Sequence, residues 1–301
     1  MRYAIEHITE YHYSQPVGLS LQLAHLRPRD TDWQKCLSHS LLVSPGAVSQ
    51  HDGRDYFGNG ITRFEIEGAH HVLSVSARSE VEIHREPWPA ADALPDWQTV
   101  RAAFAETMWG TSEASIASEF LFASSHVPQL NSLRDFAAAC FEEGGSILDG
   151  ALALTHYIHE EFEFDPTATH VTTPVETVLS IRRGVCQDFA HLMIASLRSL
   201  GLPARYVSGY LLTEPPPGQP RLVGADASHA WVALYVPEYG WLEFDPTNDC
   251  MAGDAHITLA WGRDFADVSP LRGVILGGGE HTVDVGVTVT PLSRPEKPRK
   301  A

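Results

Sequence analysis

The stretch RGVCQDFAHLM, residues 183–193, decides the fold because it places a cysteine where a helix begins. Apolar side chains then recur along one stripe at three- and four-residue steps, a spacing that predicts an amphipathic helix. They are Cys186, Phe189, Ala190, Met193, Leu197 and Leu200. Residues 201–203, Gly-Leu-Pro, are typical of a helix end, and residues 204–212 are rich in strand-forming side chains. The sequence therefore predicts a core-packed helix that presents a thiol at its first turn.

A thiol in this position has the surroundings of a nucleophile. Only the thiolate attacks, and the free N–H groups and positive dipole end of a helix favour that form. Arg182 and Arg183 add positive charge if their side chains point toward Cys186. Gly184 permits a tight entry into the helix. The backbone N–H of Cys186 is the obvious donor to a developing oxyanion.

A histidine and an aspartate follow on one predicted hairpin. Residues 228–236 are apolar and aromatic and predict a buried strand, residues 237–240 a turn, and residues 241–245 a returning strand. His229 begins the first strand and Asp245 ends the second. Both therefore lie toward the end of the hairpin that is away from its turn.

The register of this hairpin decides whether the two side chains meet. If Tyr235 lies opposite Trp241, His229 and Asp245 share one face, whereas a slip by one residue separates them. On one face, His229 can take the thiol proton and later protonate a leaving amine. Asp245 can accept from the other ring nitrogen and so fix the tautomer.

Each of these residues also has a plainer interpretation. Cys186 can be a small buried hydrophobe, and His229 can be a core histidine bonded to a backbone carbonyl. Asp245 can cap the turn at Thr247 or Asn248, as is common for Asp-Pro-Thr-Asn. Each plain interpretation is favoured when its residue is taken singly. Taken jointly and in this order, the three residues favour a catalytic interpretation.

Four motifs together resemble those of bacterial transglutaminase-like proteins. They are GVCQDFA at 184–190, GLPARYVSGY at 201–210, HAW at 229–231 and DPTN at 245–248. The resemblance implies an α+β fold whose papain-like core packs the cysteine helix on an antiparallel sheet. It also implies a triad of Cys186 as nucleophile, His229 as general base and acid, and Asp245 as the group that orients His229. Residues 1–13 are similar to the β-rich N-terminal domain that is often fused to this core.

The resemblance leaves the acyl acceptor open. Water gives a peptidase or amidase, and an amine gives a cross-linking enzyme. Many bacterial members of the family are expected to be peptidases, so the expected activity is peptide-bond or amide hydrolysis through a thioester acyl-enzyme. The alternatives are a protein-glutamine gamma-glutamyltransferase, which transamidates or deamidates, and a non-catalytic binding module. Four aromatic residues are candidate cleft walls, although plain sheet core is favoured for most of them: Trp231, Trp241, Tyr206 and Tyr210.

Composition places the chain among soluble globular proteins. Its 301 residues are enough for one large or two modest domains, and 44% hydrophobic and 20% charged residues are ordinary values. The net charge of −17 argues against a nucleic-acid partner, and no apolar run has the length of a membrane span. The start of the chain lacks signal-peptide features, so a cytoplasmic location is expected. The resemblance to transglutaminase-like proteins implies a peptide or protein substrate.

Metal and cofactor chemistry is not expected. The four cysteines are too widely spaced for a structural zinc site, and no dense carboxylate loop resembles a calcium site. Sixteen histidines make a metal hydrolase the first rival function. His156 and His159 lie three apart on a predicted helix, but no HExxH pattern occurs and a solvated face is favoured. His191 lies off the helical face of Cys186 and is not expected to be its base.

The chain divides into five expected segments. These are a small β-sandwich at 1–86, a helical segment at 87–145, the catalytic core at 146–270, a C-terminal strand at 271–293 and a disordered tail at 294–301. The C-terminal strand could pair with either domain. Strands are expected at 4–13, 38–43, 61–67, 72–83 and 283–289, and helices at 97–109, 115–123, 130–143 and 147–162. After Thr247 the core is expected to become irregular, and the segment 214–220 is expected to be a proline-rich loop.

Overall fold

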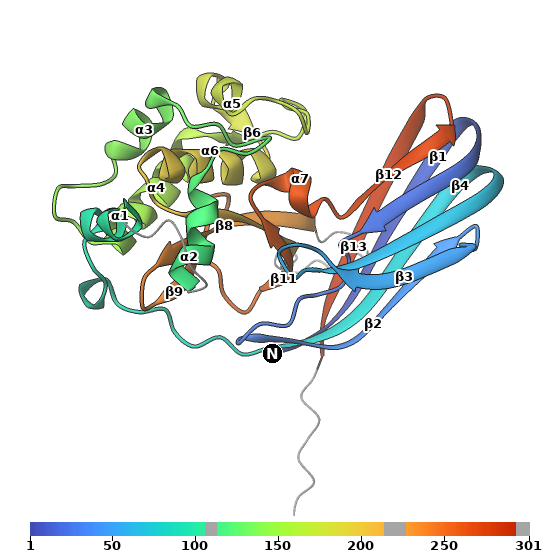
Figure 1. The fold of residues 1–301 in the computed structure, drawn as a ribbon, viewed down its shortest axis with the longest axis horizontal. Helices are drawn as coiled ribbons and strands as arrows, with labels where there is room; N and C mark the ends of the chain where they lie inside the picture. The colour runs from blue at the N-terminus through green and yellow to red at the C-terminus, as the bar shows by residue number, and fades with distance from the viewer. Residues whose placement is uncertain (106–112, 214–226, 293–301) are drawn as a thin grey trace, which may run out of the picture.

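The protein is described by a computed structural model that covers residues 1–105, 113–213 and 227–292. Two antiparallel sheets dominate it, a six-stranded sheet on the right of Figure 1 and a five-stranded sheet among the helices on the left. The expected α+β fold, with a β region ahead of the core, is confirmed. Within the residues covered, no helix is long and apolar enough to cross a membrane.

The six-stranded sheet is built on two long strands. Its order is β12-β1-β4-β2, with β13 also paired to β1 and β3 to β4. The bounds are β1 Arg2–Ala24, β2 Gln34–Ser44, β3 Ser49–Arg54, β4 Gly60–Ile83, β12 Leu271–Gly277 and β13 His281–Leu292. The expected N-terminal β domain is present, and its strands form one hydrogen-bonded network because β1 and β4 pair with different neighbours at their two ends. Gly68 lies where the pairing of β4 with β1 is irregular, and its φ of +97° lets the strand continue through that position.

The last two strands of the chain pair with β1 and complete the N-terminal sheet. Residues 2–13 of β1 pair with β13, and residues 17–24 pair with β12. The segment expected to be one C-terminal strand is therefore two strands, and both join the N-terminal sheet (Figure 1). Gly277, Gly278 and Gly279, with φ of 97°, 92° and 63°, make the left-handed turn between them. The expected tail at 294–301 and the loop at 214–220 lie outside the described residues.

Helices surround the second sheet. Their bounds are η1 Ala91–Ala93, α1 Trp97–Ala105, α2 Glu113–Ala117, η2 Ser118–Leu121, α3 Asn131–Ala138, α4 Ile147–Glu161, α5 Val175–Ile181, α6 Cys186–Ser199 and α7 Phe265–Val268. The helix expected at 115–123 is a short α-helix followed by a 3-10 turn, and α3 ends before the expected residue 143. Part of the helix expected at 97–109 lies outside the described residues.

The five-stranded sheet has the order β10-β9-β8-β7-β11 and is antiparallel throughout. Its strands are β7 Ala204–Leu211, β8 Ala227–Val236, β9 Gly240–Asp245, β10 Cys250–Met251 and β11 His256–Gly262. A separate parallel pair, β5 Glu163–Phe164 and β6 Arg183–Gly184, leads into α6. The expectation of irregular structure after Thr247 is wrong, because Ile257, Leu259 and Trp261 alternate with other residues along an edge strand.

Helix α6 is the centre of the core. All its residues from Asp188 to Arg198 are buried, and it packs on β7 and β8. Arg198 closes the C-terminal end by donating to the carbonyl oxygens of Ala204 and Arg263 at 2.6 to 2.9 Å. A helix enclosed in this way cannot tilt freely, so its first residue is held in a fixed position.

The N-terminal sheet is joined to the core through buried polar contacts. His7 Nδ1 lies 2.8 Å from the hydroxyl of Tyr210. Gln34 donates to the carbonyl oxygen of Thr258 at 2.7 Å and accepts from its amide at 2.9 Å. Because these groups are buried, breaking the contacts leaves unsatisfied polar atoms. These contacts therefore fix the N-terminal sheet in one position relative to the five-stranded sheet.

Candidate active site

The candidate residues meet at one end of the five-stranded sheet. Strand β7 returns antiparallel to α6, so the beginning of α6 lies near the end of β7 and the start of β8. Gly209 of β7 pairs with His229 of β8. A Cβ at Gly209 would lie 2.1 Å from the carbonyl oxygen of Ile257 and 2.5 Å from the ring of Trp231, so only glycine fits. Close strand packing at this end thus depends on that glycine.

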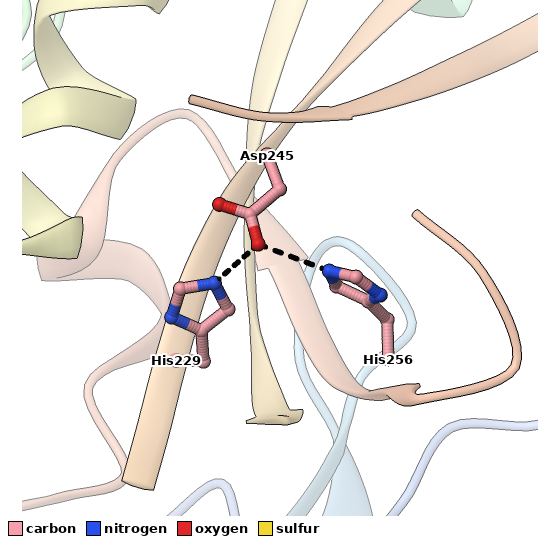
Figure 2. A group of neighbouring side chains, drawn as sticks. All are labelled: His229, Asp245 and His256. Atoms are coloured by element: carbon pink, nitrogen blue, oxygen red, sulfur yellow. Dashed lines mark hydrogen bonds and ion pairs between the residues drawn. The ribbon is translucent and has the colours of Figure 1, made fainter. Parts of the chain in front are cut away.

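The hairpin has the even register that the site needs. Tyr235 pairs with Trp241, and the ladder continues to Val232 opposite Phe244. His229 and Asp245 therefore project from one face. His229 Nε2 lies 2.7 Å from Asp245 Oδ2, and both side chains are buried (Figure 2).

The thiol of Cys186 lies near the imidazole. It is close enough to raise the pKa of His229, as Asp245 also does. Because Nε2 faces the carboxylate, the nitrogen that remains for the thiol is Nδ1. The ring thus connects the nucleophile candidate to the carboxylate. The structure brings together the three residues that the sequence singled out.

The two carboxylate oxygens of Asp245 accept hydrogen bonds from different donors. Oδ1 accepts from the backbone amides of Thr247 and Asn248 at 3.0 and 3.2 Å. Oδ2 accepts from His229 and from the side-chain amide of Asn248, the latter at 2.7 Å. Asp245 therefore both caps the turn and orients His229. The turn fixes the carboxylate against which the imidazole is aligned.

A second histidine, missed in the sequence analysis, contacts the same carboxylate. His256 Nε2 lies 3.0 Å from Asp245 Oδ2, on the side opposite His229 (Figure 2). The amide of Gly253 donates to His256 Nδ1 at 3.2 Å, so the ring carries its proton on Nε2 and donates it to Asp245. The apolar alternation of β11 was the signal that could have placed His256 at a strand start beside the site.

The electrostatics favour an ion pair. Burial alone lowers the pKa of His229, but the hydrogen bonds to Asp245 and Cys186 outweigh burial and raise it to about 10. Burial alone raises the pKa of Asp245, but the hydrogen bonds from His229 and His256 hold it well below its usual value. At neutral pH the site therefore contains an imidazolium and a carboxylate.

The first turn of α6 is fixed by a buried carboxyl group. Asp188 Oδ2 accepts from the amide of Val185 at 2.9 Å and from the hydroxyl of Thr169 at 2.6 Å. A Cβ at Gly184 would lie 2.8 Å from that oxygen, which explains the glycine at the helix entry. The amides of the first helical turn have no acceptor within the helix, so the Cys186 N–H is available to a ligand oxygen.

The two arginines upstream do not add free positive charge. Arg182 forms an ion pair with Glu161, and Arg183 contacts Asp165 and lies 3.4 Å from Glu163. These contacts are at the exposed surface and neutralise the guanidinium charges locally. The expected assistance from these arginines is therefore corrected. The charge that faces the thiol comes from the imidazolium and the helix N-terminus.

The other histidines considered from the sequence have separate contacts. His156 Nδ1 lies 2.8 Å from Asp249, and His159 Nδ1 lies 3.0 Å from the carbonyl oxygen of Thr247. His191 is buried and accepts from the amide of Phe265 at 3.1 Å. Over the described ranges, the side chains with metal-ligand spacing are His229, Asp245 and His256, within 4.8 Å of one another.

The aromatic candidates divide into two groups. Trp231, Tyr206 and Tyr210 are buried in the core, as the plainer interpretation has it. Trp241 is half-buried and lines a cavity that also contains Arg205, away from the thiol. These three side chains are therefore too buried to form the wall of an open substrate cleft.

The other cysteines provide an internal comparison for Cys186. All four are free and partly buried. Burial raises the pKa of Cys36 and of Cys140, and burial together with nearby carboxylates raises the pKa of Cys250 to about 11. Only Cys186 has an imidazolium beside it. At neutral pH the other three thiols should therefore react slowly with alkylating agents.

Replacing His256 tests whether the second histidine supports this arrangement. In His256→Phe, Asp245 loses a donor and holds His229 less firmly, so alkylation of Cys186 at pH 7 should slow by about tenfold, the value of one hydrogen bond to a charged group. His256→Gln keeps a donor of similar reach and should restore most of the rate. Site-resolved mass spectrometry measures both. Equal rates in the phenylalanine variant and the parent would show that His256 only fills space.

Comparison with known proteins gives a consistent assignment. Residues 3–82 match the model of the bacterial transglutaminase-like N-terminal region, and residues 134–246 match that of the transglutaminase-like superfamily. An uncharacterized protein of Mycobacterium tuberculosis is 37% identical over 299 residues, covering 97% of this chain and 93% of the relative. A protein-glutamine gamma-glutamyltransferase of Pseudomonas aeruginosa is 39% identical over 137 residues, which are 40% of this chain and 20% of that enzyme.

A solved structure shares the whole fold. The crystal structure described as that of a candidate cysteine protease from Cytophaga hutchinsonii has a TM-score of 0.75 and 22% sequence identity. The match covers 99% of this chain and 93% of that one. Both the N-terminal sheet and the helical core therefore recur together in another bacterial protein.

Proposed function

The chain belongs to the transglutaminase-like superfamily and carries the bacterial transglutaminase-like N-terminal region, and on that premise we propose that it is a cysteine acyl-transfer enzyme that hydrolyses peptide or amide bonds. The observation that supports this most strongly is that Cys186, at the start of α6, lies beside His229, whose Nε2 is 2.7 Å from Asp245 Oδ2. A merely structural histidine has no need of both a thiol beside its ring and a fully buried carboxylate bonded to one of its nitrogens.

Acylation would use each group once. The Cys186 sulfur attacks the carbonyl carbon, and its proton resides on Nδ1 of His229. The carbonyl oxygen becomes an oxyanion next to the Cys186 N–H and the positive end of α6. When the intermediate collapses, the C–N bond breaks and the leaving amine takes the Nδ1 proton. The product is a thioester on Cys186.

Deacylation would use the same residues with the direction of proton transfer reversed. Water attacks the thioester carbon and gives a proton to His229. The C–S bond breaks, the acid leaves, and the thiol with its imidazole partner is regenerated. Asp245 stays ionised throughout and holds the ring by its hydrogen bond to Nε2.

Amine transfer is the second candidate function. It is supported by the likeness of 137 residues to a named protein-glutamine gamma-glutamyltransferase of Pseudomonas aeruginosa. In this version an amine replaces water as the attacking group, and the product is an amide. The chemistry of Cys186, His229 and Asp245 is otherwise unchanged, so the two functions differ in the acceptor alone.

The test is an assay that records both products at once. The protein is incubated with a quenched peptide library and, separately, with a glutamine-containing protein plus a fluorescent primary amine. Peptide cleavage that is lost in Cys186→Ala supports hydrolysis, and amine incorporation lost in that variant supports the second candidate. Absence of both products, together with no labelling of Cys186 by acyl-directed probes, would contradict catalysis and favour a binding module.

A further inference from the structure

Residues 163–173 follow α4 and run beside β6, which leads into α6 (Figure 1). Phe164 pairs with Gly184 in the parallel ladder of β5 and β6. The amide of Asp165 then donates to the carbonyl oxygen of Gly184 at 2.8 Å. Gly184 precedes Cys186 by two residues, so the ladder fixes the start of this segment next to the nucleophile candidate.

Two further contacts hold the rest of the segment against the first turn of α6. The Thr169 hydroxyl donates to Asp188 Oδ2 at 2.6 Å. Gln187 Nε2 donates to the carbonyl oxygen of Val171 at 3.2 Å. Gln187 and Asp188 are the two residues that follow Cys186. The segment therefore contacts the chain both before and after the residue that carries the thiol.

The register of the short ladder shows the direction in which Phe164 points. Residues that are paired across two strands project their side chains to the same face. A Cβ at Gly184 would lie 2.8 Å from Oδ2 of Asp188, so the face that Gly184 shares with Phe164 is the one on which α6 begins. Neighbouring strands lie about 4.8 Å apart and two residues of chain span at most about 7 Å. The Cα of Phe164 is therefore within about 12 Å of that of Cys186.

Two large apolar side chains of this segment are left in solvent. Phe164 is 55% exposed and Val171 is 53% exposed. A single exposed apolar side chain is common and needs no explanation. These two, however, belong to a segment that is fixed against the residues on both sides of Cys186, and covering them would remove apolar surface from water. Phe164 and Val171 are called the apolar wall below.

The acidic groups of the same segment are neutralised locally. Asp165 forms an ion pair with Arg183 and accepts from the amide and hydroxyl of Thr167 at 2.8 and 2.7 Å. Glu163 lies 3.4 Å from Arg183. Neither acid of residues 163–173 is left unpaired, so the segment presents apolar surface without a free carboxylate to attract a basic side chain.

We propose that the apolar wall binds an apolar side chain of a peptide substrate, within two residues of the bond that is cleaved. Successive Cα atoms of a peptide are about 3.8 Å apart, so a side chain one or two residues from the reacting carbonyl can reach the wall. Contact with the wall removes apolar surface from water and favours such a side chain over glycine or aspartate. This inference rests on the proposed function, because it names the substrate preference of the same site.

The test uses alkylating agents that each carry one amino-acid side chain. They are the N-iodoacetyl derivatives of leucinamide, glycinamide and aspartic acid α-amide, which share the reactive group of iodoacetamide. Site-resolved mass spectrometry measures the rate of alkylation of Cys186 in the full chain at pH 7, and glutathione gives the intrinsic reactivity of each reagent. Iodoacetamide itself has no side chain to bind, so its rate reports the activation of the thiol alone.

The variants change the wall and leave the triad untouched. Phe164→Ala and Val171→Ser each remove one side of the wall, and Phe164→Leu keeps it apolar. Phe122→Ala is the matched control, because Phe122 is 56% exposed and its carbonyl oxygen accepts from Arg198 near the far end of α6. Since all three positions are exposed, the variants should fold and should keep the parent rate with iodoacetamide.

In the parent, the leucine reagent should alkylate Cys186 at least about fivefold faster than the glycine or the aspartate reagent, after correction for intrinsic reactivity. This preference should fall to about twofold or less in Phe164→Ala and Val171→Ser, and it should persist in Phe164→Leu and Phe122→Ala. Equal rates of the leucine and glycine reagents in the parent would overturn the proposal, as would an unchanged preference in both Phe164→Ala and Val171→Ser.

Iodoacetamide distinguishes a failure of this proposal from a failure of the proposed function. If Cys186 reacts with iodoacetamide faster than the other cysteines but shows no preference for leucine, the apolar wall alone is wrong. If Cys186 reacts with iodoacetamide no faster than the other cysteines, the proposed function is contradicted, and the substrate role of the wall with it.

Discussion

Replacing Cys186 with alanine should abolish every acyl-transfer activity of the protein while leaving its fold intact. The sulfur is the group that forms the covalent bond, so removing it should lower kcat/KM by roughly 10⁴-fold or more. The side chain is only partly buried at the first position of α6, so the change in the free energy of unfolding should stay below about 1 kcal/mol. Peptide cleavage, probe labelling and urea unfolding measure these quantities.

Cys140→Ala is the matched control for that variant. Cys140 is also partly buried, but burial raises its pKa and no histidine contact assists it. It should keep full activity and full probe labelling at Cys186. If Cys186→Ala retained the parent rate of product formation, the assignment of the nucleophile would be wrong.

Replacing Asp245 with asparagine should have the second largest effect. The carboxylate is the principal group that holds the pKa of His229 at about 10, against the effect of burial. Without it, burial and the loss of the negative charge favour the neutral ring at pH 7. The thiol then loses its imidazolium partner and the leaving amine its proton donor, so kcat/KM should fall by roughly 10²–10⁴-fold.

The same variant should change how stability depends on pH. The raised pKa of His229 contributes stability that is complete below its unfolded value of 6.5 and is lost as pH rises through about 10. The depressed pKa of Asp245 contributes stability that is present above 3.8 and is lost at lower pH. The stability difference between parent and Asp245→Asn should therefore be largest near pH 5 to 6 and shrink toward pH 10.

Asp249→Asn controls for a general effect in this turn. Asp249 is exposed and pairs with His156 instead of His229. Its replacement should leave kcat/KM within about twofold, because surface ion pairs contribute little. A pH-independent stability difference for Asp245→Asn, or activity equal to that of Asp249→Asn, would argue against an ion pair between His229 and Asp245.

The sequence was most informative where local pattern and chemistry coincide. Helix α6 runs from Cys186 to Ser199, as its apolar stripe and the glycine at 201 predicted. The sequence located both strands of the hairpin but left two registers open, and the structure has the even one, with Tyr235 opposite Trp241. The positions of His229 and Asp245 relative to each other follow from that register alone.

What the sequence did not reveal depends on contacts between distant segments. Nothing local shows that residues 271–292 return to pair with β1, because that pairing joins segments more than 250 residues apart. His256 was missed for the same reason, since it reaches Asp245 from the far edge strand. The ion pairs of Arg182 and Arg183 with Glu161 and Asp165 were also not predictable from chain order.

The measurement that tests the central claim most directly is a time course of iodoacetamide alkylation, resolved for each cysteine by mass spectrometry between pH 5 and 10. The account predicts that Cys186 reacts much faster than Cys36, Cys140 and Cys250 below pH 8, and that His229→Ala removes this advantage. If Cys186 instead reacts no faster than the other three, or equally fast without His229, the thiol is not activated. A degenerate binding domain would then be the better account of the chain.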